Sequence, residues 1–321
     1  MARKLSASCI DLHSPFCPCI LAETNHCILC SHLKGQSTCD CNWAGVCILY
    51  EKYWQPKICT DEKPTVRIEV ETTISRRELI ATNTHLLGFT VNESLAAELG
   101  KTGSFVFLKQ PSDPEFFHFP VGVMKVNGRM VEVVIEDVGP KSKRLLTGGE
   151  QIVVRGPYYN GILGQPWIDN ITCGTIILVV GGMGQGPALA IGTKLLANQN
   201  NVIAIIAPGK TEKIFIGQEL RELGAMVYAV DSLRRSGMGI LGRLFEAGEK
   251  IDLVVSTGPD EQHYGVIAAM QCASVNIPMA ATNNATMCCG EGICGSCQRE
   301  AVDNRTLRMC KVQTDFSQLA T

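Results

Sequence analysis

The chain of 321 residues has no hydrophobic run that is long enough to cross a membrane. Its longest apolar run, residues 175–180, has the length of a strand, whereas a membrane helix needs about 20 residues. The first 30 residues lack the apolar core of a signal peptide. The formal net charge is only −2, and no long basic run occurs, so nothing indicates nucleic-acid binding. We therefore expect a cytoplasmic protein of several domains without a membrane span.

Cysteine, in contrast, is abundant, with 16 residues placed unevenly along the chain. Nine lie within residues 9–59 and five within 288–310. A reducing compartment keeps thiols free, so disulfides are not expected. Cys173 and Cys272 stand between the two groups, and we interpret them as buried thiols that act as small hydrophobic residues. The pattern predicts two metal-binding ends around an ordinary globular middle.

The cysteine run near the carboxyl end has the spacing C-x4-C-x2-C…C. Each iron of a two-iron cluster needs two sulfur ligands, and three ligands on one short loop require tight turns. Gly290, Gly292 and Gly295 supply that freedom. Zinc is the alternative, but zinc knuckles use paired C-x2-C units and only one such pair is present. We predict a [2Fe–2S] cluster in residues 285–321, with the ligands Cys289, Cys294, Cys297 and Cys310.

The amino-terminal segment, residues 1–62, shows neither helical nor strand periodicity and is predicted to be a metal-binding extension. One or two [4Fe–4S] clusters, which need four ligands each, are the first interpretation. Zinc is the second, and thiols that are redox-active or without a ligand are the third. The C-x-C pairs are unlike the common C-x2-C-x2-C run of iron–sulfur proteins. The candidate ligands are Cys17, Cys19, Cys27, Cys30, Cys39, Cys41, Cys47 and Cys59.

Alternating polar and apolar residues follow in residues 63–167. The stretches 66–75, 104–110, 121–126 and 130–137 are typical of strands, and Asn127-Gly128 is a hairpin turn. Several short strands at this spacing predict a small antiparallel barrel that ends near residue 157.

Residues 168–284 alternate between apolar strands and helical stretches, of which residues 211–224 are one, and this alternation predicts a doubly wound parallel sheet. Residues 181–188, GGMGQGPA, form a glycine-rich turn directly after the first of these strands. Such a turn lets the backbone approach a pyrophosphate at a helix amino terminus. A second turn, residues 256–262, follows another strand, so both turns are expected to flank one crevice. A plain turn without a ligand is the alternative for each.

Three further turn-like stretches lie in the barrel region, at residues 118–123, 136–145 and 155–163. Each one alone is more typical of an ordinary turn than of a ligand site. Their order, followed by the glycine turns and the cysteine run, is similar to that of the ferredoxin-reductase superfamily. More closely, residues 65–310 resemble the electron-transfer subunit of dihydroorotate dehydrogenase B and its relatives. These relatives include the small subunit of the bifurcating NADH-dependent ferredoxin:NADP oxidoreductase and sulfide dehydrogenase-like subunits.

This resemblance implies an FAD site in the barrel and an NAD(P) site in the α/β domain. The family's R-P-x-S stretch corresponds to residues 119–122, where arginine is replaced by phenylalanine and serine by glycine. Lys141, Lys143 and Arg155 are candidates to replace the lost positive charge. Threonine also stands where the family has the cysteine of a C-G-P turn. The implied FAD residues are Phe119, Pro120, Val121, Gly122, Gly139, Lys141 and Ser142, and the implied NAD(P) residues are Gly182, Gly184, Gly186, Thr257, Gly258 and Pro259.

The function implied by the resemblance is an oxidoreductase subunit that transfers electrons between NAD(P)H, FAD and the [2Fe–2S] cluster. A catalytic subunit or a ferredoxin is the expected partner, and a hetero-oligomer the expected assembly. NADH is favoured over NADPH by the resemblance alone, although Lys210 and Lys213 are candidates to bind a 2′-phosphate. Two alternatives remain. One is a self-sufficient NAD(P)H:ferredoxin reductase, and the other is a redox- or metal-sensing binding protein on a reductase fold.

Overall fold

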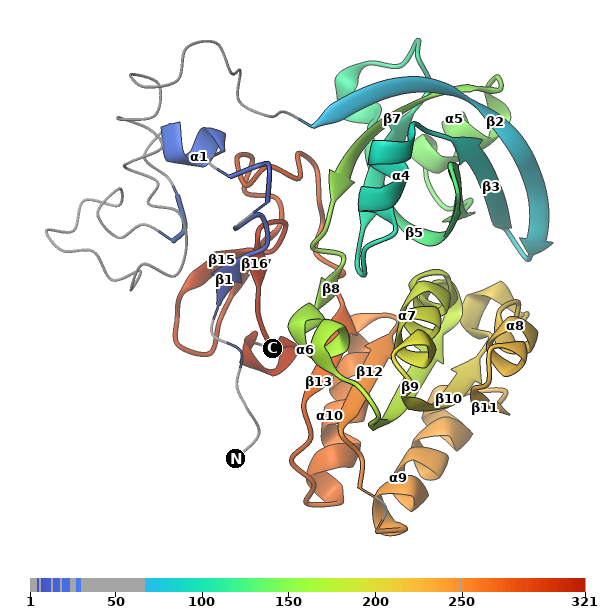
Figure 1. Ribbon diagram of the computed structural model, residues 1–321, viewed down its shortest axis with the longest axis vertical. Coiled ribbons are helices and arrows are strands. Elements are labelled where there is room, and N and C mark those ends of the chain that lie inside the picture. Colours follow the sequence, from blue (N-terminus) through green and yellow to red (C-terminus); the bar gives the residue numbers. More distant parts are fainter. Residues whose placement is uncertain are drawn as a thin grey trace, which may run out of the picture.

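The computed structural model describes residues 5, 7–12, 14–17, 19–23, 27–29, 67–248 and 250–320. Figure 1 shows a β-barrel above an α/β domain, with the carboxyl-terminal and amino-terminal segments together beside both of them. No helix in the described ranges is long and apolar enough to cross a membrane.

Six antiparallel strands close the barrel in the order β2-β3-β6-β5-β4-β7. Its interior is apolar, and Leu87, Phe89, Val106 and Val131 are fully buried there. Helix α4, which is capped by the side chain of Asn92, and helix α5 accompany the strands. The elements are β2 (Ile68–Ala81), β3 (Thr84–Thr90), α4 (Glu93–Leu99), β4 (Phe105–Lys109), β5 (Phe119–Asn127), β6 (Met130–Glu136), α5 (Pro140–Thr147) and β7 (Gln151–Tyr158).

The α/β domain has a six-stranded sheet in the order β11-β10-β9-β12-β13-β8. Five strands are parallel, and the first of them in sequence, β9, lies in the middle, as in a doubly wound sheet. Strands β9 and β12 are buried on both faces. The elements are β8 (Ile162–Leu163), α6 (Gln165–Asn170), β9 (Thr175–Gly181), α7 (Gln185–Ala197), β10 (Asn201–Ala207), α8 (Gly217–Glu222), β11 (Met226–Ala229), α9 (Met238–Glu246), β12 (Leu253–Thr257), α10 (Asp260–Cys272) and β13 (Met279–Thr282).

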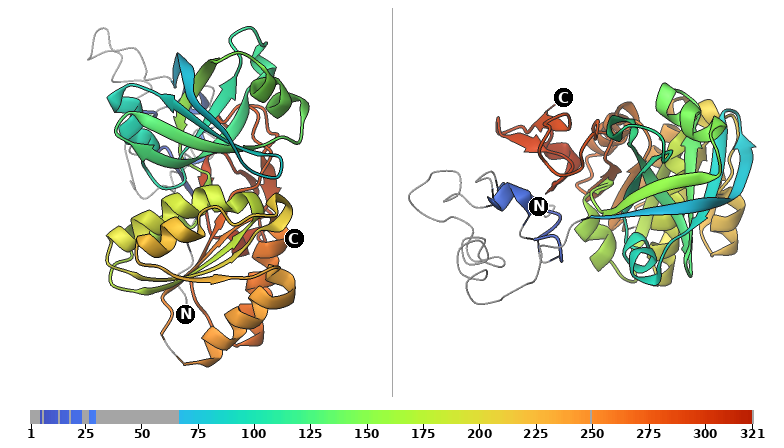
Figure 2. Two further views of the ribbon diagram at one scale, coloured as in Figure 1. Left: turned by 90° about the vertical axis from the view of Figure 1, so that its right-hand side faces the viewer. Right: turned by 90° about the horizontal axis from the view of Figure 1, so that it is seen from above.

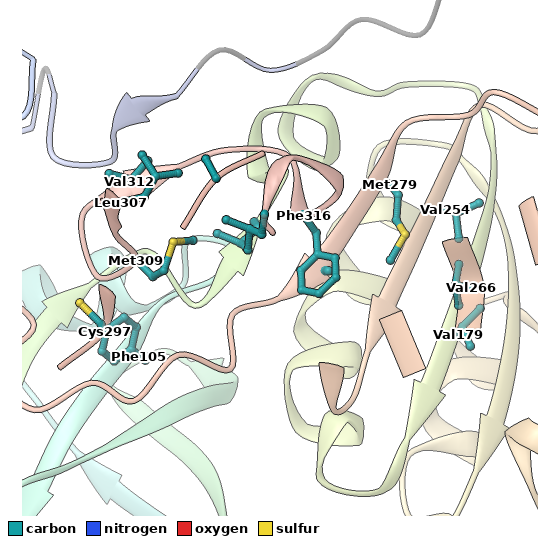
Figure 3. Packing of buried hydrophobic residues seen from close by; sticks show 14 of the residues in the cluster. Phe105, Val179, Val254, Val266, Met279, Cys297, Leu307, Met309, Val312 and Phe316 are labelled. Atoms are coloured by element: carbon teal, nitrogen blue, oxygen red, sulfur yellow. The ribbon is translucent and has the colours of Figure 1, made fainter. Parts of the chain in front are cut away.

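Residues 285–320, called the cluster lobe below, fill the angle between barrel and α/β domain. The lobe contains β14 (Gln298–Glu300), β15 (Thr306–Arg308) and β16 (Val312–Gln313). Figure 3 shows its apolar side chains in one continuous core, from Phe105 on the barrel through Met309 to Phe316 beside the sheet. The lobe is therefore held by both neighbours, which fixes its position relative to each.

The described part of the amino-terminal segment packs on this lobe. Strand β1 (Ser8–Cys9) pairs antiparallel with β16, and the short helix α1 (Ile20–Glu23) follows. Seen from above in Figure 2, the blue amino-terminal segment and the red lobe lie next to each other at one side of the molecule. Segments at opposite ends of the sequence thus meet in space.

The structure corrects three expectations. The helical stretch expected at residues 211–224 is helical only over Gly217–Glu222, because a short 3-10 turn, Gly209–Thr211, and a loop precede it. Cys173 and Cys272 are exposed rather than buried. The sequence pattern also missed strand β3, in which Gly88 interrupts the alternation.

Candidate functional site

A cavity of about 920 Å³ lies between the barrel, helix α7 and the start of the cluster lobe. Its volume is within the range of small-molecule and cofactor sites, about 300–1,000 Å³. All seven residues that the sequence associates with FAD line it, from strand β5 and from the start of helix α5. Met287, which lies two residues before Cys289, also lines it and so connects the cavity to the cluster lobe.

Two glycines give this cavity its free space. A Cβ added to Gly122 or to Gly139 would meet no atom within 4 Å in the described part of the chain, so nothing there requires glycine at these positions. The space suits a ligand that contacts the backbone closely. The amino terminus of α5, which carries positive potential, opens on the same cavity and suits a phosphate. The residues present therefore fit a flavin dinucleotide, and their assignment stays a prediction.

The three residues that are candidates to replace the lost positive charge lie in different places in the structure. Lys141 lines the cavity, and its ammonium donates to the carbonyl of His118 at 2.9 Å. Lys143 is exposed and outside the cavity wall. Arg155, on strand β7, instead donates to the carbonyl of Cys289 at 3.3 Å and so contacts the cluster lobe. The hydroxyl of Ser142 accepts from the backbone N–H of Gly139 at 3.1 Å and thereby shapes the start of α5.

A second cavity, of about 1040 Å³, opens at the carboxyl ends of β9, β10 and β12. This is the crevice where open α/β sheets bind ligands. Four residues of the predicted nucleotide set line it, namely Gly182, Gly184, Gly258 and Pro259. Gly186 lines the first cavity instead. Thr257 is fully buried, and its hydroxyl donates to the carbonyl of Val179 at 3.5 Å.

Three glycines of this crevice, Gly182, Gly184 and Gly258, are required by the fold itself. A Cβ on Gly184 would lie 2.1 Å from the carbonyl oxygen of Thr257, because the two turns approach each other closely. A Cβ on Gly258 would lie 2.1 Å from Oε1 of Gln262, and Gly182 has a left-handed φ of 53°. The amide of Gln262 donates to the carbonyl of Val179 at 3.0 Å and to that of Thr257 at 3.2 Å, which joins the second turn to strand β9.

The two cavities share a wall. Five residues line both of them, so two ligands bound there would lie next to each other. The shared residues are Glu136, Met183, Pro187, Thr282 and Asn284.

The cluster lobe brings three of the four predicted thiolates together. The backbone N–H of Glu291 donates to Sγ of Cys289 at 3.3 Å, and that of Gly292 to Sγ of Cys310 at 3.2 Å. The N–H of Cys310 donates to Sγ of Cys297 at 3.4 Å. The fourth residue, Cys294, is exposed, and its Sγ lies 3.1 Å from the hydroxyl of Ser296.

The loop glycines adopt the conformation that the spacing predicted. Gly290, Gly292 and Gly295 have φ values of 71°, 73° and 76°, which side chains disfavour. Hydrogen bonding from the Cys310 thiol and from backbone N–H groups lowers the pKa of Cys289 to about 3. Thiolate is the form that binds iron, and backbone donors at cluster sulfurs are typical of iron–sulfur loops. The donor set therefore fits a [2Fe–2S] group.

The second, amino-terminal set of cysteines is described only in part. Cys17, Cys19 and Cys27 belong to the described residues, and Cys19 directly precedes α1. Burial and the charge of Asp11 raise the pKa of the neighbouring Cys9 to about 12. The remaining candidates, Cys30, Cys39, Cys41, Cys47 and Cys59, lie outside the described residues.

Several residues of these sites were not identified from the sequence. Three of them, Asp231, Ser232 and Arg234, line the second cavity from the loop after β11. Here the backbone makes one π-helical turn, Leu233–Gly237, an irregularity that is frequent at functional sites. The pair Arg234-Arg235 is visible in the sequence, but only the fold places Arg234 at the crevice.

No protein-family model matches the chain. Individual curated proteins are similar to it in sequence. The electron transfer subunit of dihydroorotate dehydrogenase B (NAD(+)) of Clostridium perfringens is 26% identical over 198 residues, which are 61% of this chain and 76% of the relative. The probable subunit of Methanocaldococcus jannaschii is 27% identical over 217 residues, 66% and 77% of the two chains. That of Methanocella arvoryzae is 27% identical over 183 residues, 56% and 67%.

Solved structures share the fold. A chain of the NADH-dependent reduced ferredoxin–NADP oxidoreductase superposes with a TM-score of 0.63 at 19% identity, over 78% of this chain and 89% of that one. Phthalate dioxygenase reductase superposes with a TM-score of 0.51 at 13% identity, over 78% and 97%. The barrel and the α/β domain together have the ferredoxin-reductase fold.

Proposed function

The chain is related in sequence to the electron-transfer subunits of dihydroorotate dehydrogenase B, and from this premise we propose that it is an NAD(P)H-dependent flavin and iron–sulfur oxidoreductase. It passes electrons between NAD(P)H, FAD and a [2Fe–2S] cluster, and on to a partner. The observation that carries the proposal is the arrangement of three adjoining sites, namely two cavities with a common wall and a thiolate loop beside the first cavity.

FAD supplies the conversion between hydride chemistry and single-electron steps. The protein's own residues bind the cofactors, orient them and keep them apart. Gly122, Gly139 and Lys141 line the first cavity, called the flavin cavity below. Gly182 and Gly184 line the second cavity, called the nucleotide crevice, and present backbone to the pyrophosphate of the nucleotide. Cys289, Cys294, Cys297 and Cys310 are the proposed iron ligands.

We propose NAD(H) as the nucleotide, in line with the printed names of the relatives. Asp231 lines the crevice, and an acidic residue there suits a free ribose hydroxyl. Lys210 and Arg234 line the same crevice, so the comparison with NADPH is part of the test.

The partner that we propose is a catalytic oxidoreductase subunit, as the subunit names of the relatives suggest, or a ferredoxin. The amino-terminal cysteines would then hold an additional iron–sulfur cluster or a zinc ion. Metal analysis of the full chain distinguishes iron in excess of two atoms from zinc.

The test is an anaerobic preparation of the reconstituted chain, titrated with NADH and with NADPH. Flavin absorbance that is bleached by NADH, with two or more irons per chain, supports the proposal. A chain that holds its full iron but no flavin would contradict it. Rapid NADH-driven reduction of an added ferredoxin by the isolated chain would favour the self-sufficient reductase over an obligate subunit.

A further inference from the structure

Three charged side chains lie buried where the amino-terminal segment meets the cluster lobe, and a fourth, Glu291, is partly exposed beside them. Asp11 and Lys311 are each 1% exposed, and the side chain of Arg67 is 7% exposed. The ammonium of Lys311 lies 2.6 Å from Asp11 and 2.9 Å from Glu291. Arg67 donates twice to Asp11, at 2.8 and 2.9 Å. Two positive and two negative charges therefore balance one another, with Glu291 at the edge that faces water.

Two members of this network belong to the iron–sulfur loop. Glu291 lies between the predicted ligands Cys289 and Cys294, and Lys311 directly follows Cys310. Asp11 comes from the opposite end of the chain, 300 residues away from Lys311 in sequence. A buried carboxylate in contact with two cations is stabilising only while all partners stay in place. Asp11 thus joins the amino-terminal segment to the loop that carries the thiolates.

Apolar packing and backbone pairing support the same contact. The ring of Phe16 stacks on the guanidinium of Arg67, with 3.9 Å from its central carbon to the ring centroid. A Cβ on Gly292 would lie 2.8 Å from Cδ1 of Leu21, so the segment contacts the loop backbone directly. The N–H of Ile10 donates to the carbonyl of Lys311 at 2.8 Å, next to the β1–β16 pairing.

We propose that residues 8–12, 14–17 and 19–22 form a docked cover of the iron–sulfur loop, and that Asp11 is the positioning residue that holds this cover and balances the charge beside the cluster. The part of the proposal that concerns the cluster rests on the proposed function. Removal of the charge of Asp11 leaves one net positive charge in the network. Reduction adds one negative charge to the cluster, so the loss of the negative charge of Asp11 is expected to raise the reduction potential of the cluster.

The test uses the full chain with Asp11→Asn and, as the matched control, Asp303→Asn. Asp303 lies in the same lobe, but it is exposed and pairs only with its neighbour Arg305, at 2.8 Å. Asp11→Asn is expected to raise the midpoint potential of the [2Fe–2S] signal in an EPR redox titration. Proteolysis within residues 8–22 and bleaching of the cluster in air are expected to become several-fold faster. Asp303→Asn is expected to match the wild type in all three measurements.

A second variant separates charge from docking. Asp11→Asn combined with Lys311→Gln restores the charge balance without restoring the contact, so the potential should return toward the wild-type value while proteolysis stays fast. Faster proteolysis with an unchanged potential in Asp11→Asn would overturn the electrostatic part. Wild-type behaviour in all measurements would overturn the whole proposal.

Phe16→Ala keeps all four charges, and it is the variant to test if the Asp11→Asn protein does not fold and cannot be purified. It is expected to speed both proteolysis of the cover and loss of the cluster, and unchanged rates would overturn the docking. Proteolysis of the iron-free chain tests the docking without any cofactor. A wild-type chain that shows no EPR signal contradicts the proposed function, and this outcome is distinct from a failure of the cover.

Discussion

The flavin cavity and the nucleotide crevice are both lined by glycines, but for different physical reasons. In the crevice, a side chain on Gly184 would strike the backbone of Thr257 at 2.1 Å. In the flavin cavity, a side chain on Gly122 or Gly139 would enter empty space. Glycine at position 184 is therefore a condition of folding, whereas glycine at positions 122 and 139 is a condition of ligand binding. Substitutions at the two kinds of position should separate stability from cofactor affinity.

The largest effect is expected for Gly184→Ala. The contact with a backbone carbonyl cannot relax by moving a side chain, so the free energy of unfolding should fall by about 3 kcal/mol. Chemical denaturation of the cofactor-free protein measures this change. Gly186→Ala is the control two residues later, where the nearest atom to the new Cβ is Val134 Cβ at 3.9 Å. Equal stability of the two variants would contradict the distinction.

The next largest effect is a pH dependence of the folding stability, and it comes from His263 beneath the crevice. His263 is fully buried behind the turn, with Nδ1 2.8 Å from the hydroxyl of Ser256, and burial lowers its pKa to about 4. The unfolded chain takes up this proton near pH 6.5, so it binds more protons than the folded chain between pH 6.5 and 4. Stability should therefore fall as the pH falls through this window, by about 2 kcal/mol between pH 6.5 and 5.

Denaturation curves at several pH values test this expectation. His263→Gln should remove that part of the slope, whereas His85→Gln in the barrel should keep it. A slope that survives in His263→Gln would assign it to other groups.

A smaller change is expected in the flavin cavity. Gly122→Leu fills space that a ligand would use, so flavin affinity should fall about tenfold or more, which corresponds to about 1.4 kcal/mol. The stability of the cofactor-free protein should stay within about 1 kcal/mol of the wild type. Fluorescence titration with FAD measures the affinity. Gly149→Leu, which also meets open space but lies outside the cavity, is the control.

The smallest effect concerns charge at the same cavity. Lys141→Met removes the one cation of the three candidates that lines the cavity, and FAD affinity should fall about threefold, less at high salt. Lys143→Met on the same helix lies outside the cavity wall and should leave the affinity unchanged. Equal losses in the two variants would argue against a phosphate contact of Lys141.

Local chemistry made part of this arrangement predictable. The cysteine spacing and the glycines at strand ends depend only on neighbouring residues, so the thiolate loop and both turns could be placed from the sequence. The FAD and NAD(P) residues came from the family resemblance. The cavities gather all of the first set, but of the second set Gly186 lies in the flavin cavity and Thr257 is buried.

Other features depend on the fold as a whole and could not be predicted. The contact between Asp11 and Lys311 joins residues 300 positions apart, and no local pattern indicates it. The π-helical turn brings Arg234 to the crevice only because β11 lies at the edge of the sheet. The turns and the cysteine run were thus visible in the sequence, whereas these contacts between distant side chains were not.

The central claim is that electrons pass between the two adjoining cavities and the thiolate loop. The direct measurement is an EPR spectrum of the anaerobic chain after addition of NADH, recorded with the flavin present and after its removal. The account predicts the rhombic signal of a reduced [2Fe–2S] cluster only when flavin is present. A signal of equal size without flavin, or no signal from a chain that holds both cofactors, would contradict it.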